Sequence, residues 1–222
     1  MGDLYPVSDF YAFEELLTEP ELAKLRSLRT VLDEQVTPVL ADHWERAESP
    51  KHLFPRFAEL GVVANMQPLW ARHEAQMDVL TIPFLGTRRA AWQYPFGSLH
   101  RAGAPLASGS DWPVSTANPL EIIHTSVNRA PAGATGASAL PFLGEQALSL
   151  ADALIAHSLG TAYLNHDEER SGSIEVGKAG DIVILDRDIF AAPVAEIGSA
   201  TVAYTIIGGE VVYDANSALV SA

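Results

Sequence analysis

The apolar run Ala104–Ala107, followed by the turn Gly109–Val114, constrains the fold of this chain more than any other segment. The run is typical of a short buried strand, and the turn places one acid, Asp111, where that strand ends. Carboxylates at the loop end of a strand in an α/β sheet are favoured positions for catalysis. Asp111 has no companion motif, because the sequence contains no His-x-His pair, no His-Glu-x-x-His motif and no cysteine.

Composition limits the class of protein. The chain has 222 residues, of which 48% are hydrophobic, so it is long enough to bury a core. The formal net charge is −14, which disfavours binding to nucleic acid and to anionic membranes. The first residues lack a basic signal-peptide segment, and no uncharged apolar run is long enough to span a bilayer. We therefore expect a cytoplasmic protein.

The first 60 residues are predicted to be helical. Thr18-Glu19-Pro20-Glu21 has the capping-box pattern that begins a helix. Apolar residues then recur at helical spacing: Leu22, Leu25, Leu28, Leu32, Val36 and Val39. Pro38 is expected to kink or end that helix, and a second helix is expected over Leu53–Leu60, ended by Gly61.

Residues 61–170 alternate between strand and helix patterns. Strands are predicted over 62–66 and 105–108, and helices over 88–102, 118–129 and 150–159. This order is typical of a parallel sheet with helical crossovers, so we predict an α/β fold. After residue 171 the chain becomes rich in β patterns, at 182–185, 200–207 and 210–213, with Gly208-Gly209 as a hairpin turn. The predicted parts are therefore 1–60, 61–170 and 171–222.

Several motifs in residues 56–214 carry a family resemblance. They are Gln67-Pro68-Leu69-Trp70, Phe84-Leu85-Gly86 with Arg88, Gly109-Ser110-Asp111-Trp112-Pro113-Val114, and Gly172-Ser173-Ile174-Glu175-Val176-Gly177-Lys178 with Asp181. Together they resemble the amidohydrolase superfamily, and most of all its branch of N-substituted formamide deformylases and related metal-dependent amide hydrolases.

This resemblance implies an incomplete (β/α)8 barrel. The matched region corresponds to the last two barrel strands and helices and to one half of a small β-sandwich. Asp111 then corresponds to the acid at the end of the eighth strand, which binds metal or acts as general base toward the attacking water. The histidines and the bridging residue that complete the family's metal site come from earlier strands, and no segment here corresponds to them. One carboxylate is too few for a catalytic zinc, which takes three protein ligands.

The first 60 residues resemble the N-terminal helices of acyl-CoA dehydrogenases instead. Leu16-Leu17-Thr18-Glu19, the following leucine-rich helix and Trp44-Glu45-Arg46-Ala47-Glu48 carry this weaker likeness. The resemblance predicts a chimeric or shortened chain joined between Ser49 and Gly61. No flavin site is carried over, and we expect no FAD, because no glycine-rich dinucleotide motif is present.

The candidate site is built around Asp111. His73 is the candidate second metal ligand, with zinc as the expected ion and a second chain completing the site. Gln67, Arg88 and Trp112 are expected to line the substrate-binding mouth. The alternative for His73 is an ordinary surface residue. Surface or packing roles are likewise expected for a further set of histidines: His43, His52, His100, His124, His157 and His166.

Two functions remain open at this point. The first is a metal-dependent hydrolase acting on a small-molecule amide, ester or phosphoester, with Asp111 as its catalytic residue. The second is an inactive fragment that associates with itself, because two barrel strands cannot close a barrel and leave open edges. In both cases we expect a homo-oligomer with exchanged elements.

Overall fold

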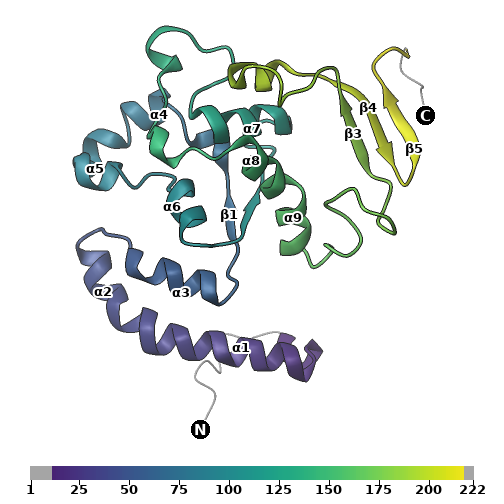
Figure 1. Cartoon of the computed structure of the whole chain (residues 1–222). Coiled ribbons are helices and arrows are strands. Elements are labelled where there is room, and N and C mark those ends of the chain that lie inside the picture. Colours follow the sequence, from purple (N-terminus) through teal and green to yellow (C-terminus); the bar gives the residue numbers. More distant parts are fainter. Residues whose placement is uncertain (1–11, 218–222) are drawn as a thin grey trace. The chain divides into compact units, whose positions relative to one another are not determined.

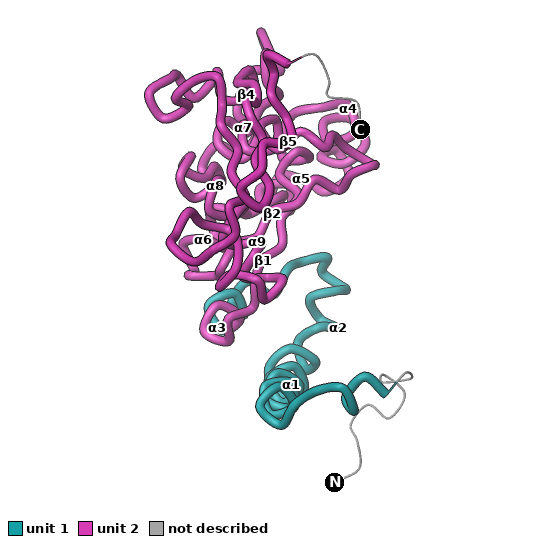
Figure 2. The backbone as a smooth tube through the Cα atoms, turned by 90° about the vertical axis from the view of Figure 1, so that its right-hand side faces the viewer, with its two compact units in different colours: residues 1–56 teal, residues 57–222 magenta. Residues whose placement is uncertain are grey.

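The computed structural model describes residues 12–217, in which helices accompany two small sheets (Figure 1). The predicted α/β class is therefore confirmed. Contacts within the chain divide it into two units, Met1–Arg56 and Phe57–Ala222, which Figure 2 shows in different colours. The finer division into 1–60, 61–170 and 171–222 stays a prediction.

The first unit is helical, as the leucine spacing predicts. Its elements are η1 (Phe13–Leu16), α1 (Glu19–Val31), the π-helical turn η2 (Leu32–Val36), α2 (Thr37–Glu45) and η3 (Lys51–Leu53). The capping box is present at the start of α1, where the backbone N–H of Thr18 donates to Glu21 Oε2 at 2.7 Å. This bond satisfies a group at the helix end that would otherwise lack a partner.

The helix does not end at Pro38, contrary to one of the two outcomes expected there. Pro38 lies in the first turn of α2, where its missing N–H removes no helical hydrogen bond. The π-helical turn Leu32–Val36 comes directly before it and joins α1 to α2. A change of helix type therefore accommodates the proline.

The second unit contains both sheets. From its start to the end of β2 it has α3 (Phe54–Glu59, which starts in the first unit), β1 (Ala64–Met66), η4 (Pro68–Trp70), α4 (Ala75–Asp78), α5 (Ile82–Ala90), α6 (Phe96–Arg101) and β2 (Leu106–Ser108). It continues with α7 (Pro119–Asn128), η5 (Gly136–Ala139), η6 (Gly144–Gln146), α8 (Leu150–His157), α9 (Leu159–Leu164), β3 (Ile182–Leu185), η7 (Val194–Ser199), β4 (Val202–Ile207) and β5 (Glu210–Asp214).

One predicted helix is wrong in its bounds. Residues 88–102 form the end of α5 and a separate helix α6, with a break at 91–95. Tyr94 there has a φ of 49°, which lies outside the helical region, and Pro95 follows it. The helices over 118–129 and 150–159 are confirmed as α7 and α8, each capped by a side chain, Asn118 and Ser149 respectively.

β1 and β2 form a parallel pair, in which Ala64 lies opposite Leu106 and Met66 opposite Ser108. Both strands therefore end at the same edge of the sheet. Buried residues surround the pair and make the main core: Met66, Ala71, Phe96, Leu106, Ile123, Leu148, Ala153, Ala156 and Ile197. The core fixes the strand ends from which the candidate site extends.

The outer side of β2 meets helix α9. Thr161 Oγ1 lies 2.9 Å from the carbonyl oxygen of Ala156 and 3.3 Å from that of Ser108, so this edge, expected to be open, is partly covered. The remaining strands form an antiparallel sheet in the order β3-β4-β5. Its hairpin turn is at Gly208-Gly209, as predicted, and the N–H of Gly208 donates to Asp181 Oδ1 at 2.7 Å.

No single helix among residues 12–217 has the length and apolar character needed to cross a bilayer. Two helical segments, Gly136–Gln146 and Leu150–Leu164, reach this length and apolar character only when they are counted together, and the chain bends sharply between them.

Candidate functional site

Asp111 lies in a tight turn directly after β2. The backbone N–H groups of Val114 and Ser115 donate to its carbonyl oxygen at 2.8 and 3.2 Å. The N–H of Trp112 donates to Ser110 Oγ at 3.1 Å, and the Ser115 hydroxyl donates to the Ser110 carbonyl. These bonds fix the backbone on both sides of Asp111, so the turn holds its carboxylate at the end of the strand.

The backbone of Asp111 is strained. Its φ is 60°, in the left-handed region that costs a residue with a Cβ about 1–2 kcal/mol. Strain of this kind concentrates at functional positions, where the surrounding structure enforces it. The side chain is half-buried and makes no hydrogen bond or ion pair with any residue in 12–217. Its carboxylate therefore keeps all its lone pairs for a water molecule, an ion or a substrate.

His73 is held by another acid. Its Nδ1 lies 2.7 Å from Asp78 Oδ1, and its ring meets the edge of Phe142 at a centroid distance of 5.2 Å. One ring nitrogen is thus already engaged, and the structure gives no contact between His73 and Asp111. Within residues 12–217 no three His, Cys, Asp or Glu side chains lie close enough to hold a metal ion. The proposed Asp111–His73 metal pair therefore stays a prediction.

The three predicted lining residues are exposed. Gln67 directly follows β1, and its carbonyl oxygen accepts from the N–H of Trp70 at 3.4 Å. Because β1 and β2 end at the same edge, Gln67 and the Asp111 turn follow neighbouring strand ends. Trp112 is 67% exposed, and Arg88 lies on the exposed side of α5. Whether these side chains bind substrate stays a prediction.

Arg129 is the buried charged residue that the sequence did not single out. It follows α7 with a φ of 53° and is fully buried. Its Nε donates to the carbonyl of Phe142 at 2.8 Å and its Nη1 to that of Tyr94 at 3.2 Å, and its guanidinium lies over the rings of Phe96 and Phe142. Burial lowers the pKa of Arg129 to about 10 and raises the pKa of Tyr94.

Arg129 therefore stays charged at neutral pH and supports the loop that packs on His73. Its Nη2 has no hydrogen-bond partner among residues 12–217. In sequence the residue looks like the last position of an ordinary helix, and no local pattern marks it as buried.

Comparison with known proteins gives one family. The model of the amidohydrolase family (Amidohydro_3) matches residues 20–213. This chain belongs to the amidohydrolase family. The matched range includes most of the helical segment before residue 60, whose resemblance to acyl-CoA dehydrogenases stays a prediction.

Individual relatives agree with this family. The chain is 35% identical over 173 residues to "Protein LONG AFTER FAR-RED 3" of Arabidopsis thaliana, covering 76% of this chain and 28% of that protein. It is 30% identical over 122 residues to the N-substituted formamide deformylase of Arthrobacter pascens, covering 54% and 21%. A solved structure of an uncharacterized metal-dependent hydrolase from Pyrococcus horikoshii matches with a TM-score of 0.53 and 25% identity, covering 66% and 28%. This amidohydrolase-family chain thus spans less than a third of each of these relatives.

Proposed function

We propose that this chain carries the Asp111 part of an amidohydrolase-type hydrolytic centre, which acts on an amide, ester or phosphoester bond of a small molecule. In this proposal β1 and β2 are the last two strands of a (β/α)8 barrel, and β3–β5 are half of its accompanying β-sandwich. One observation carries it: the unpartnered carboxylate of Asp111 is held in a strained turn at the end of a parallel strand.

Asp111 has a defined part in this chemistry. A carboxylate without internal partners accepts a hydrogen bond from water and takes its proton as the water attacks the carbonyl carbon or the phosphorus. The acid then returns this proton to the amine or alcohol that leaves as the scissile bond breaks. The backbone bonds at Val114 and Ser115 keep the acid from turning away. Exposed Gln67, Arg88 and Trp112 are our candidates for contacts with the substrate.

The predicted divalent ion, Zn²⁺ by preference, is not accommodated by residues 12–217 taken by themselves. A catalytic zinc takes three protein ligands, and no described group of three is present. His73 also gives one ring nitrogen to Asp78. An ion at Asp111 therefore requires donors beyond residues 12–217, such as those of a second copy of the chain, and no catalytic step is assigned to it.

The test combines activity assays with measurements of metal content and solution mass. The purified chain is assayed against an N-substituted formamide, a p-nitrophenyl ester and a phosphoester, together with elemental analysis and solution mass. Asp111→Asn is expected to lower any turnover at least a hundredfold, within the range that general acid–base groups contribute. Glu210→Gln, which removes the same charge from strand β5, is expected to keep it. Turnover that survives Asp111→Asn contradicts the proposal.

A second function is favoured by the exposed sheet. Val183, Ile207, Val211 and Val212 are each more than half exposed on the β3–β5 sheet. Apolar exposure of this kind is typical of a surface that another chain covers. The alternative is therefore a self-associating protein without turnover, and its signature is a stable oligomer that holds no metal.

The edges of this sheet do not favour self-pairing. Asp181 and Asp186 lie at the two ends of β3, and Glu210 and Asp214 at the ends of β5. Two copies that paired antiparallel through either edge would place these acids opposite each other, which is unfavourable. We therefore propose association through the sheet faces. A monomeric mass at all concentrations contradicts this alternative.

A further inference from the structure

Two histidines of the first unit lie close together at the turn between α2 and η3. The ring centroids of His43 and His52 are 5.7 Å apart, and the ring planes meet at an angle of 32°. His43 is in the last turn of α2, and His52 is in η3. Both belong to the unit of residues 1–56, teal in Figure 2, whereas Asp111 belongs to the other unit. The pair is therefore independent of the hydrolytic centre proposed above.

Backbone hydrogen bonds hold the turn between the two histidines. The N–H of Glu48 donates to the carbonyl of His43 at 2.9 Å, and the N–H of Leu53 donates to the carbonyl of Pro50 at 2.9 Å. Leu53, the neighbour of His52, is 4% exposed and anchors η3. The backbone therefore fixes the spacing of the two rings before any ligand arrives, which lowers the cost of binding.

Neither ring is engaged by the protein. No hydrogen bond or ion pair joins His43 or His52 to another residue in 12–217. Nδ1 of His43 is covered, but Nε2 of this partly buried ring stays accessible, and the His52 ring is exposed. Four other histidines each have a ring nitrogen close to a partner: His73, His100, His124 and His157. Because a neutral imidazole keeps one nitrogen lone pair, the His43 and His52 pair offers two.

The spacing of these rings fits one shared metal ion. With a metal–nitrogen bond of about 2.0–2.1 Å, two imidazoles on one ion have ring centres about 5–6.5 Å apart. The observed 5.7 Å lies within this range. Imidazole nitrogen is a favourable ligand for Zn²⁺, Ni²⁺ and Cu²⁺, whereas Mg²⁺ takes oxygen ligands.

We propose that His43 and His52 form a two-imidazole binding site for a divalent transition-metal ion. One nitrogen of each ring binds the ion, and water fills the remaining positions, because no third ligating side chain within residues 12–217 completes the group. Glu48, the acid in the same turn, lies 3.5 Å from Arg46 and is not counted as a ligand. A bound ion joins the end of α2 to η3 and therefore stabilises the folded first unit.

The first test is calorimetric titration of the untagged full chain with Ni²⁺ after removal of metals by dialysis against a chelator. Mg²⁺ is the control, because the net charge of −14 attracts any cation whereas only Ni²⁺ favours imidazole. We expect saturable binding of one Ni²⁺ per chain and no binding of Mg²⁺. Equal binding of both ions, or no Ni²⁺ binding up to about 1 mM, overturns the proposal.

Three variants localise the ion. His43→Gln and His52→Gln each remove one of the two ligands and are expected to weaken Ni²⁺ binding about tenfold or more. His100→Gln removes an exposed imidazole from α6 and is expected to leave the affinity within about twofold. If either His43→Gln or His52→Gln binds Ni²⁺ as tightly as the parent chain, the ion is not shared and the proposal is wrong.

A measurement on the unaltered protein covers the case in which a variant fails to fold. We expect the imidazole ¹⁵N resonances of His43 and His52 to shift together on addition of Zn²⁺, while those of His100 stay in place. Shifts confined to other histidines overturn the site. Elemental analysis then separates this inference from the hydrolytic proposal, because metal that His43→Gln loses was bound to this pair and not to Asp111.

Discussion

The backbone N–H of Gly198 donates to Nδ1 of His124 at 3.3 Å, across 74 positions of the sequence. His124 is 3% exposed within helix α7, and Gly198 belongs to η7. Asn128 reinforces the contact, because its Nδ2 donates to the carbonyl of Val194 at 2.9 Å. Helix α7 and η7 are thus joined by polar bonds, and Nδ1 of His124 must stay unprotonated to accept.

This contact predicts how stability depends on pH. Burial lowers the pKa of both His124 and His157, whereas an unfolded histidine titrates near 6.5. Below about pH 6.5 these histidines bind protons in the unfolded chain but stay neutral in the folded chain, so the free energy of unfolding falls. Each histidine can lower the free energy of unfolding by at most about 1.4 kcal/mol per pH unit.

Urea unfolding at pH 7.5, 6.5 and 5.5 measures this effect. We expect stability to decrease across the series and the decrease to become smaller in His124→Gln, because one of the two buried rings is gone. The carboxylates with lowered pKa values, such as Asp186, lose their contribution only at lower pH. Constant stability between pH 7.5 and 5.5 contradicts the prediction.

The buried guanidinium gives a second prediction. Arg129→Lys keeps a positive charge, yet a lysine cannot donate to the carbonyls of Phe142 and Tyr94 in the same fork geometry. We expect a loss of about 2–3 kcal/mol, the range for hydrogen bonds to charged groups. Arg101→Lys is the matched control, since Arg101 is exposed, and it is expected to change stability by less than about 0.5 kcal/mol. Equal denaturant midpoints for Arg129→Lys and Arg101→Lys contradict this prediction.

Local sequence signals predict much of the backbone of this chain. The capping residues Thr18, Asn118 and Ser149 each begin a helix in the structure. The glycine pair at 208 and 209 forms the expected hairpin turn between β4 and β5. These signals succeed because a cap or a tight turn depends on a few neighbouring residues.

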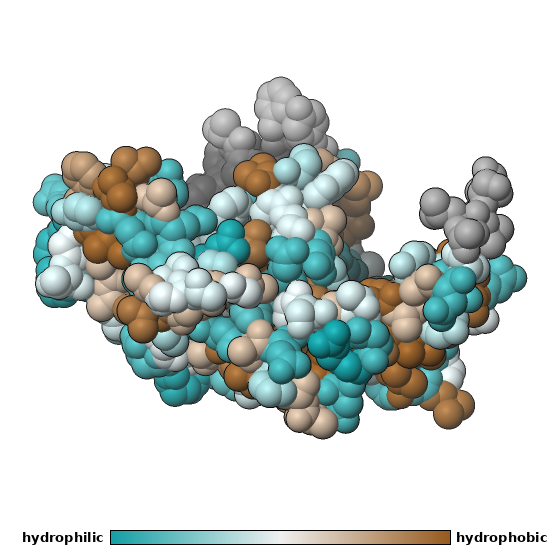
Figure 3. Space-filling model, turned by 90° about the horizontal axis from the view of Figure 1, so that it is seen from above, coloured by the Kyte–Doolittle hydropathy of each residue, from teal (hydrophilic) through white to brown (hydrophobic). Residues whose placement is uncertain are grey.

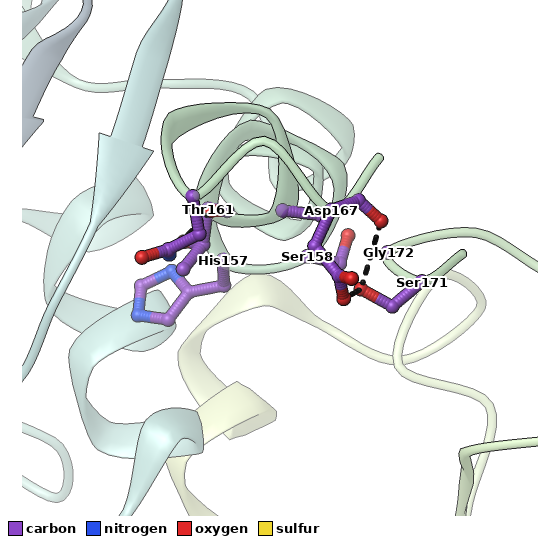
Figure 4. A pocket seen from close by; sticks show the side chains of 8 residues that line it. His157, Ser158, Thr161, Asp167, Ser171 and Gly172 are labelled. Carbon is purple, nitrogen blue, oxygen red and sulfur yellow. Dashed lines mark hydrogen bonds between the residues drawn. The ribbon is translucent and has the colours of Figure 1, made fainter. Parts of the chain in front are cut away.

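Features that depend on tertiary contacts were not predicted. The break at Tyr94 separates two helices that the pattern joins, and Tyr94 also accepts from the buried Arg129. The pocket that His157 and Asp167 help to line (Figure 4) combines residues of two helices and a loop, and no spacing rule marks it. The same holds for the engagement of His73 by Asp78, which turns a candidate metal ligand into one half of a local pair.

Local sequence patterns likewise do not predict which hydrophobic side chains are exposed. Hydrophobic side chains on the face shown in Figure 3 lie in small groups separated by hydrophilic ones. Phe84, Trp112 and Val114 are all at least two-thirds exposed, although a short pattern would assign such residues to a core.

The strained turn at Asp111 makes a third prediction. Glycine adopts a φ of 60° freely, whereas alanine does not. Asp111→Ala is therefore expected to be less stable than Asp111→Gly by about 1 kcal/mol, a difference visible in thermal unfolding. Both variants lack the carboxylate and are expected to lose the proposed turnover alike. Equal melting temperatures mean that the turn relaxes, which removes strain as support for a functional Asp111.

The approach of helix α9 to β2 makes the last prediction. A Cβ on Gly160 would collide with the carbonyl oxygen of Leu106 and lie 3.2 Å from that of Ile155. Both neighbours are backbone atoms in the core region, so they cannot move aside cheaply. Gly160→Ala is expected to destabilise the chain by about 3 kcal/mol, or to prevent soluble expression.

Gly109→Ala is the control for this substitution. A Cβ at Gly109 meets no atom within 4 Å, although the residue follows the same strand β2. We expect its denaturation midpoint to match that of the parent chain within about 0.5 kcal/mol. If Gly160→Ala also matches the parent, then α9 does not lie against the outer side of β2, and the contact of Thr161 Oγ1 with the carbonyl oxygen of Ser108 would be absent as well.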